Sequence, residues 1–239
     1  EVTALTGKPV RFSDEAPGQA RERRSGDIAG GHVAVRPHPG VKVGGAYVRS
    51  DRPGSALMPG TTRTEDQSSV DLTFHANELI PALDASPVRV SFYGEYAGRN
   101  WRPLDDGLTT KTHTPHALYT STEVSYPGGG VSFETKDYHQ FDLRVNDPPS
   151  LVPEFSGRLL NRATHVLQSL DEKGHQLAWS QSIPLPGFPW ILEAAHARAT
   201  GRRQVLDEFL DPWEYDLFYG ALSSDPARPW QVKLFGATG

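Results

Sequence analysis

The sequence has 239 residues, of which 37% are hydrophobic and 22% charged, so it is typical of a globular chain and predicts one domain or at most two. It contains no cysteine, which excludes disulfides, thiolate metal sites and cysteine nucleophiles. The formal charge is −5 with both signs interspersed, so we expect neither a nucleic-acid partner nor a polybasic membrane patch.

Residues 1–29 are polar, rich in Arg, Asp and Glu and without sustained periodicity, and they predict a loop or extended lead-in. The chain begins with Glu1 and shows no signal-peptide pattern, so we expect a mature chain or a fragment. Over residues 30–239, short segments with an apolar residue at every second position alternate with Pro/Gly turns. This texture predicts successive antiparallel hairpins, with a polar loop over residues 51–67.

The clearest strand is 88–99. Val88, Val90 and Phe92 fall on one of its faces, and Arg89, Tyr93, Glu95 and Arg99 fall on the other. Its twelve residues span about 40 Å, which is longer than a usual globular strand. A second long hairpin is predicted from 117–126 and 131–138, with a turn at 127–130.

The rest of the chain predicts two further hairpins and one ambiguous segment. Residues 175–183 pair plausibly with 190–199, and 213–222 with 230–236, whereas 156–170 fits a strand or a short helix. Helix is plausible elsewhere only in short pieces, such as 77–83 or 204–210. The sequence therefore predicts an all-β antiparallel meander of about ten strands, folded as a transmembrane β-barrel, as part of one, or as a soluble sandwich.

Strand length and aromatic placement favour the barrel. Five segments approach the 9 to 11 residues that a membrane-spanning strand needs, whereas sandwich strands are usually shorter. Lipid-facing surfaces are predicted to carry Phe92, Leu118, Val124, Leu177 and Leu217. Four tryptophans are predicted at or just beyond strand ends, as in the interfacial girdles of barrels: Trp101, Trp190, Trp213 and Trp230. In a soluble domain the same side chains would close the ends of the core.

A specific resemblance lies in the second half of the chain. Its motifs are NDPPSLVPE from Asn146, LLNRATHVLQSLDEKGHQ ending at Gln176, and FETKDY from Phe133. They resemble those of a family of bacterial outer-membrane β-barrel proteins without assigned function, whose members are longer chains. The resemblance implies an outer-membrane location and no catalytic residues, and it leads us to expect part of a barrel.

No motif in the sequence points to an enzyme or a metal centre. His113 and His116 lie close together in THTPH but lack the further ligands of a zinc site, so we expect no metal and no cofactor. Adjacent carboxylates such as Asp105 and Asp106 point to opposite faces in extended structure. No nucleophile elbow, P-loop or dinucleotide-binding motif is present.

The charged residues of the long strands are instead predicted to line a polar barrel interior. They are Arg89, Tyr93, Glu95, Arg99, Glu123, Glu134 and Lys136. The function predicted from the sequence is a non-enzymatic outer-membrane barrel that acts as a pore or transport component or as an envelope scaffold. Its partners would be outer-membrane lipid and other envelope proteins. The alternative is a soluble all-β module that binds carbohydrate by aromatic stacking.

Overall fold

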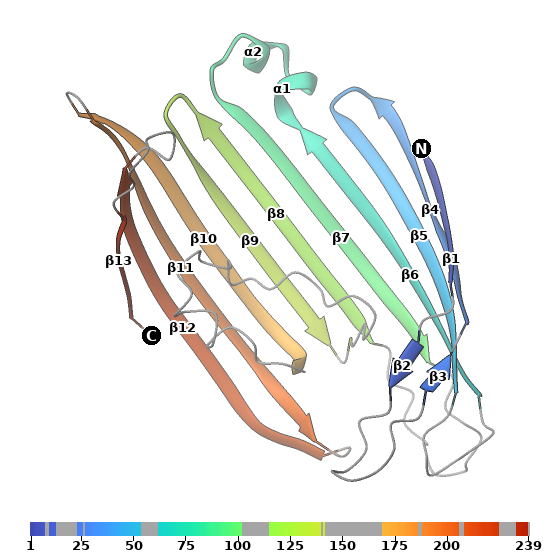
Figure 1. Ribbon diagram of the computed structural model, residues 1–239. Coiled ribbons are helices and arrows are strands. Elements are labelled where there is room, and N and C mark those ends of the chain that lie inside the picture. The colour runs from blue at the N-terminus through green and yellow to red at the C-terminus, as the bar shows by residue number, and fades with distance from the viewer. Residues whose placement is uncertain are drawn as a thin grey trace.

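The structure is a computed structural model in which one large antiparallel sheet dominates (Figure 1). It describes residues 1–7, 10–12, 23–25, 27–53, 62–101, 115–139, 141, 169–185, 188–205, 208–224 and 233–238. Within these residues the sheet has eleven strands, and a separate pair of short strands forms a second sheet. The prediction of an all-β antiparallel meander of about ten strands is confirmed, because β4 to β13 follow one another as sequential neighbours.

The strands differ in length, and those of the second half are the longest. In chain order the elements are β1 (Val2–Gly7), β2 (Val10–Phe12), β3 (Arg23–Ser25), β4 (Asp27–His38), β5 (Val41–Pro53), β6 (Thr62–His75), α1 (Ala76–Leu79), α2 (Pro81–Asp84), β7 (Arg89–Trp101), β8 (His116–Tyr126), β9 (Gly129–His139), β10 (Ser169–Leu185), β11 (Phe188–Val205), β12 (Glu208–Ser224) and β13 (Lys233–Thr238).

The strands of the sheet are connected at two ends. At one end, the turn end, residues 39–40, 127–128 and 186–187 connect hairpins, and α1 and α2 link β6 to β7 (Figure 1). Residues 225–232, between β12 and β13, also belong to this end. At the other end, the loop end, residues 54–61, 102–114, 140–168 and 206–207 make the connections, so both ends have short and longer connections.

The hairpin between β8 and β9 shows how local sequence fixes a turn. Pro127 restricts its own φ, and Gly128 adopts a positive φ of 84°, as the third residue of a type II turn requires. These two residues join Tyr126 directly to Gly129, and Tyr126 and Gly129 are register partners. The predicted turn is therefore confirmed but shorter, since Gly129 and Gly130 already belong to β9.

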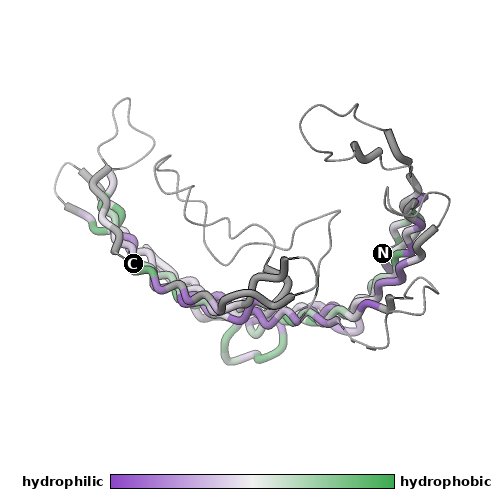
Figure 2. The backbone as a smooth tube through the Cα atoms, turned by 90° about the horizontal axis from the view of Figure 1, so that it is seen from below, coloured by the Kyte–Doolittle hydropathy of each residue, from purple (hydrophilic) through white to green (hydrophobic). Residues whose placement is uncertain are grey.

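The sheet bends into an open trough, with the α1–α2 segment projecting from its convex side (Figure 2). Cross-strand register puts Asp71, Glu95 and Lys136 on one face and Leu72, Tyr96 and Leu118 on the other. Asp71 and Lys136 are buried, whereas Leu72, Tyr96 and Leu118 are exposed. Because side chains converge on the inner side of a curved sheet and diverge on its outer side, the buried face is the concave one.

The structure corrects several boundaries. Residues 2–7, expected within a polar lead-in, form β1 and pair with residues 28–33 of β4. The predicted loop over 51–67 is shorter, because β5 continues to Pro53 and β6 begins at Thr62. Helix over 77–83 is present as α1 and α2, whereas Gln204–Val205 and Glu208–Leu210 are strand rather than helix. Of the ambiguous segment, residues 156–168 lie outside the described residues, and β10 begins at Ser169.

No helix in the part of the chain described above has the length and apolar character needed to cross a membrane.

Candidate functional site: the two faces of the curved sheet

The residues predicted to line an interior all project from the concave face. The register aligns β7 with β8 and β8 with β9 so that, for example, Glu95, Tyr119 and Lys136 stand side by side. Arg99 and Lys136 are buried, and the others are partly buried or exposed. The set on this one face comprises Arg89, Tyr93, Glu95 and Arg99 of β7, Glu123 of β8, and Glu134 and Lys136 of β9.

Two ion pairs, one buried and one partly buried, join neighbouring strands on this face. Arg99 Nη2 lies 2.8 Å from Glu65 Oε1, with exposed fractions of 8% and 2% for the two side chains. Lys136 Nζ lies 2.5 Å from Glu172 Oε1, which joins β9 to β10. Removing one member of such a pair leaves the other charge away from water without a counterion, which is costly. These contacts therefore favour the observed alignment of the neighbouring strands.

Between the two ion pairs, carboxylates meet tyrosine hydroxyls instead of cations. The Tyr93 hydroxyl donates to Glu95 at 2.8 Å, and the Tyr119 hydroxyl donates to Glu134 at 3.0 Å. The two rings are 6.2 Å apart, so both contacts belong to one cluster on β7, β8 and β9. Since a neutral hydroxyl does not cancel the charge, this cluster gives the middle of the concave face two negative groups.

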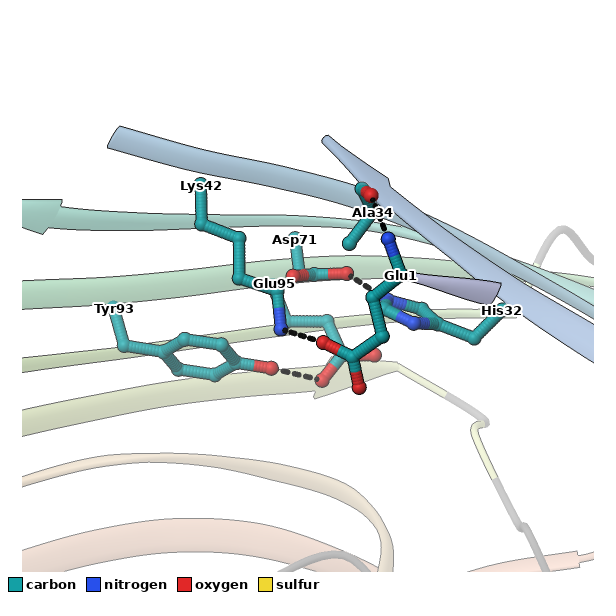
Figure 3. A network of polar contacts seen from close by, with 7 residues as sticks. All are labelled: Glu1, His32, Ala34, Lys42, Asp71, Tyr93 and Glu95. Carbon is teal, nitrogen blue, oxygen red and sulfur yellow. Dashed lines mark hydrogen bonds and ion pairs between the residues drawn. The ribbon is translucent and has the colours of Figure 1, made fainter. Parts of the chain in front are cut away.

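A further contact on the concave face joins β4 to β6 across the intervening strand β5 (Figure 3). His32 Nε2 of β4 lies 2.9 Å from Asp71 Oδ2 of β6, across Gly44 of β5. A Cβ at Gly44 would fall 2.3 Å from Asp71 Oδ2 and 2.5 Å from His32 Nε2, so a side chain there is incompatible with the contact. Beside it, Lys42 of β5 donates at 3.2 Å to Glu1, which precedes β1.

The convex face has the opposite character. All the exposed large hydrophobic side chains that lie in described strands project from it, and valine is the commonest among them. Phe92, Leu118, Val124 and Leu177 are on this face, as the sequence predicted. Leu217 was predicted there incorrectly: it pairs with Ala197 on the concave face and is buried. The exposed set is Val2, Val33, Val35, Val43, Tyr47, Val70, Leu72, Tyr96, Leu118, Phe133, Leu177 and Phe218.

Aromatic side chains border the apolar part of the convex face. Near the turn end, Trp179 Nε1 donates to the Tyr126 hydroxyl at 2.8 Å, and Trp190 lies on the same face. Toward the loop end, the Tyr96 ring stacks on His116, which contacts His139 at a centroid distance of 5.5 Å. Phe133, His175, His196 and Phe218 form a similar row across β9 to β12.

The predicted interfacial tryptophans are only partly placed at strand ends. Trp101 is the last residue of β7, at the loop end, and Trp190 lies near the start of β11. Trp213 lies inside β12, which begins at Glu208, so its expected position at a strand end was wrong. Trp230 is outside the described residues. Trp179 was missed, although the alternation of its strand would have placed it on the same face as Leu177.

Beyond the apolar part, toward the loop end, the convex face carries paired charges. Lys173 contacts Asp137 at 2.9 Å, His196 contacts Asp216 at 3.0 Å, and Arg198 pairs with Glu214. These groups continue the strands of the apolar surface, so the convex face is apolar nearer the turn end and charged nearer the loop end.

Metal ligands do not gather in groups of three or more anywhere in the described ranges. The predicted neighbours His113 and His116 cannot be compared, because His113 lies outside those ranges. His116 instead pairs in register with His139 on the convex face.

Comparisons with known proteins identify no relative. No protein-family model matches the chain, and neither the curated proteins nor the solved structures contain a match.

Substituting Gly44 tests whether the concave contact depends on space over β5. Gly44→Ala is expected to separate His32 from Asp71 and to leave the buried carboxylate without that partner, which costs about 1–3 kcal/mol. The free energy of unfolding, from reversible denaturant titration, measures the effect.

The neighbouring glycine supplies the control. Gly45 projects from the convex face, where an added Cβ comes no closer than 3.4 Å to the Ser69 carbonyl oxygen. Gly45→Ala should change stability by no more than about 0.5 kcal/mol. Equal losses in the two variants would show that the contact over Gly44 is not what constrains this position.

Proposed function

We propose that this chain forms part of a bacterial outer-membrane β-barrel, with its convex face toward lipid and its concave face toward a polar interior. The distribution of side chains between the two faces supports the proposal. The buried charged residues Glu65, Asp71, Arg99 and Lys136 lie on the concave face, whereas the exposed large apolar residues of the strands lie on the convex one. A sheet in water buries its apolar face and exposes its charges.

The limits of the apolar surface agree with a bilayer. Aromatic residues flank it toward both ends of the strands, as the girdles of outer-membrane barrels do at the two interfaces. The paired charges Lys173–Asp137 and Arg198–Glu214 follow on the loop-end side, where headgroups and water would surround them.

The soluble carbohydrate-binding alternative is less well supported. A carbohydrate-binding surface presents isolated exposed aromatic side chains among polar ones. Here the exposed aromatic residues stand among aliphatic ones, such as Val70 beside Tyr96 and Phe133 beside Leu177. A contiguous surface of this kind in water is a liability for aggregation.

Within the barrel, the chain would act without enzymatic chemistry, as a pore or transport component or as an envelope scaffold. The ion pairs Arg99–Glu65 and Lys136–Glu172 brace the wall, and the carboxylates of Glu95 and Glu134 set the charge near its middle. Such groups determine which solutes a water-filled interior admits.

Arginine substitution on the convex face tests the contact with lipid. Leu72 lies between Val43 and Gly94 within the apolar part of this face. Leu72→Arg should lower the stability of the folded protein in bilayers by about 2–4 kcal/mol, because it places a charge near the hydrocarbon midplane. Denaturant unfolding in phospholipid vesicles measures the difference.

Ser68 is the matched control, since it lies on the same strand and face but nearer the loop end. Ser68→Arg should cost no more than about 1 kcal/mol. The lipid-facing assignment fails if both substitutions are equally mild, or if the wild-type protein is monodisperse in buffer without detergent.

Neutralising the central carboxylates tests the interior. Glu95→Gln together with Glu134→Gln keeps acceptors for Tyr93 and Tyr119 but removes two negative charges. In planar bilayers the ratio of cation to anion permeability should fall by roughly twofold or more, because fixed charges at a pore wall select ions of opposite sign.

The control removes the same charge from the outer surface through Asp66→Asn and Asp216→Asn. It should leave the permeability ratio unchanged. A conducting barrel whose selectivity ignores Glu95 and Glu134 would contradict the interior position of these residues, and absence of any conductance would favour the scaffold over the pore.

A further inference from the structure

The tyrosine–carboxylate cluster of the concave face leads to an inference about the solute that the interior takes, which rests on the function proposed above. Glu95 accepts a hydrogen bond from Tyr93 at 2.8 Å (Figure 3), and Glu134 accepts one from Tyr119 at 3.0 Å. Among the described residues, no cationic side chain forms an ion pair with either carboxylate. The cluster therefore carries two negative charges that these residues leave without a counter-charge.

The cations nearby on the concave face already have acidic partners of their own. They are Lys136 with Glu172, His32 with Asp71, Lys42 with Glu1 and Arg99 with Glu65. Arg89 is exposed at the first position of β7, whereas Glu95 lies at the middle of that strand. Glu123 of β8 is exposed on the same face and adds to the negative potential. A cation that enters from solvent is therefore attracted to this part of the face.

A buried acceptor without a donor lies beside one of the two carboxylates. Gln176 of β10 is the register partner of Glu134, and both side chains project from the concave face. The Gln176 side chain is only 4% exposed, and its Oε1 has no hydrogen-bond partner among the described residues. Because a buried amide oxygen without a donor is costly, this position suits a ligand that brings N–H groups.

Tyrosine rings lie between the two carboxylates. The rings of Tyr93 and Tyr119 are 6.2 Å apart, and both side chains are partly exposed. Because β8 separates β7 from β9, the backbones that carry Glu95 and Glu134 are about 10 Å apart. Aromatic ring faces attract cations and pack against hydrocarbon, so they suit the chain that would join two positive groups.

We propose that this cluster binds a linear aliphatic diamine. One ammonium group contacts Glu95, and the other lies between Glu134 and Gln176 Oε1 and supplies the donor that this oxygen lacks. The hydrocarbon chain lies along the rings of Tyr93 and Tyr119. The two positive charges of the ligand balance the two carboxylates, and an ammonium group has donors enough for both acceptors at the Glu134 end. In the proposed barrel, such diamines are solutes that the interior admits.

Isothermal titration calorimetry on the folded full-length protein measures the binding, in buffer or in detergent, whichever keeps the protein monodisperse. We expect putrescine to bind at least roughly tenfold more tightly than butylamine, because only the diamine reaches both carboxylates. Mg²⁺ carries the same charge as putrescine but retains much of its water shell. At equal concentration it should displace putrescine only weakly.

Single substitutions locate the two ends of the diamine. Glu95→Gln and Glu134→Gln each keep an acceptor for the neighbouring tyrosine and remove one charge. Each should weaken putrescine binding by about tenfold or more. Gln176→Leu removes the amide oxygen and should weaken it by about threefold or more.

Butylamine separates the two ends. Its single ammonium group should prefer the end with the additional acceptor, so Glu134→Gln and Gln176→Leu should weaken it, whereas Glu95→Gln should not. The matched control removes two charges from the convex face through Asp66→Asn with Asp216→Asn. It should leave the affinities for both amines unchanged.

The outcomes separate this inference from the proposed function. The site is refuted if putrescine shows no saturable binding at millimolar concentrations, if Mg²⁺ displaces it fully, or if the diamine and the monoamine bind equally well. A protein that binds putrescine as described but is monodisperse without detergent keeps the site and refutes the barrel. A protein that partitions into membranes without binding putrescine keeps the barrel and refutes the site.

Discussion

The register between neighbouring strands is the constraint on which the rest of this structure depends. Side chains alternate between two faces along a strand, so a register slip of one residue would exchange the faces of everything beyond it. The irregularities between Val35 and His38, Ser169 and Asp171, and Arg202 and Arg203 all lie near strand ends. The middle of the sheet therefore keeps the same two faces across every strand. The concave face is polar from β6 to β10 and is lined by Ala197, Ala199 and Leu217 on β11 and β12.

Small residues on the concave face leave room for its long polar side chains. Long polar side chains need room when a sheet curves toward them, and Gly44 provides it for His32 and Asp71. On β11, Ala197 and Ala199 are buried on the same face beside Leu217 of β12 and Gly174 of β10. Curvature, small residues and long polar contacts thus depend on one another, and the exposed valines of the convex face are the other consequence of the same bend.

The sequence predicted what depends on alternation within a strand. Strand 88–99 assigned Arg89 and Glu95 to one face correctly, and the same reasoning grouped Glu134 with Lys136. Contacts between strands could not be predicted, since Trp179 and Tyr126 are 53 residues apart and meet only through the registers of β8 with β9 and of β9 with β10. β1 was missed because its pairing with β4 is long-range and its own composition is weakly apolar. The ion pair between Arg99 and Glu65 likewise could not be predicted, because it depends on the register of β6 with β7.

The lengths of the strands explain why the convex face changes from apolar to charged along their course. β10, β11 and β12 have 17, 18 and 17 residues, whereas about 9 to 11 tilted residues cross a bilayer. The excess lies toward the loop end, where Lys173, Arg198 and Asp216 replace the apolar residues of the convex face. A strand that continued apolar beyond the hydrocarbon would expose that surface to water, and a charged stretch within the hydrocarbon would be equally costly. In the proposed barrel, the position at which the convex face turns from apolar to charged would therefore set the depth of the sheet in the membrane. The ion pairs of the concave face would hold the strands in register at that depth.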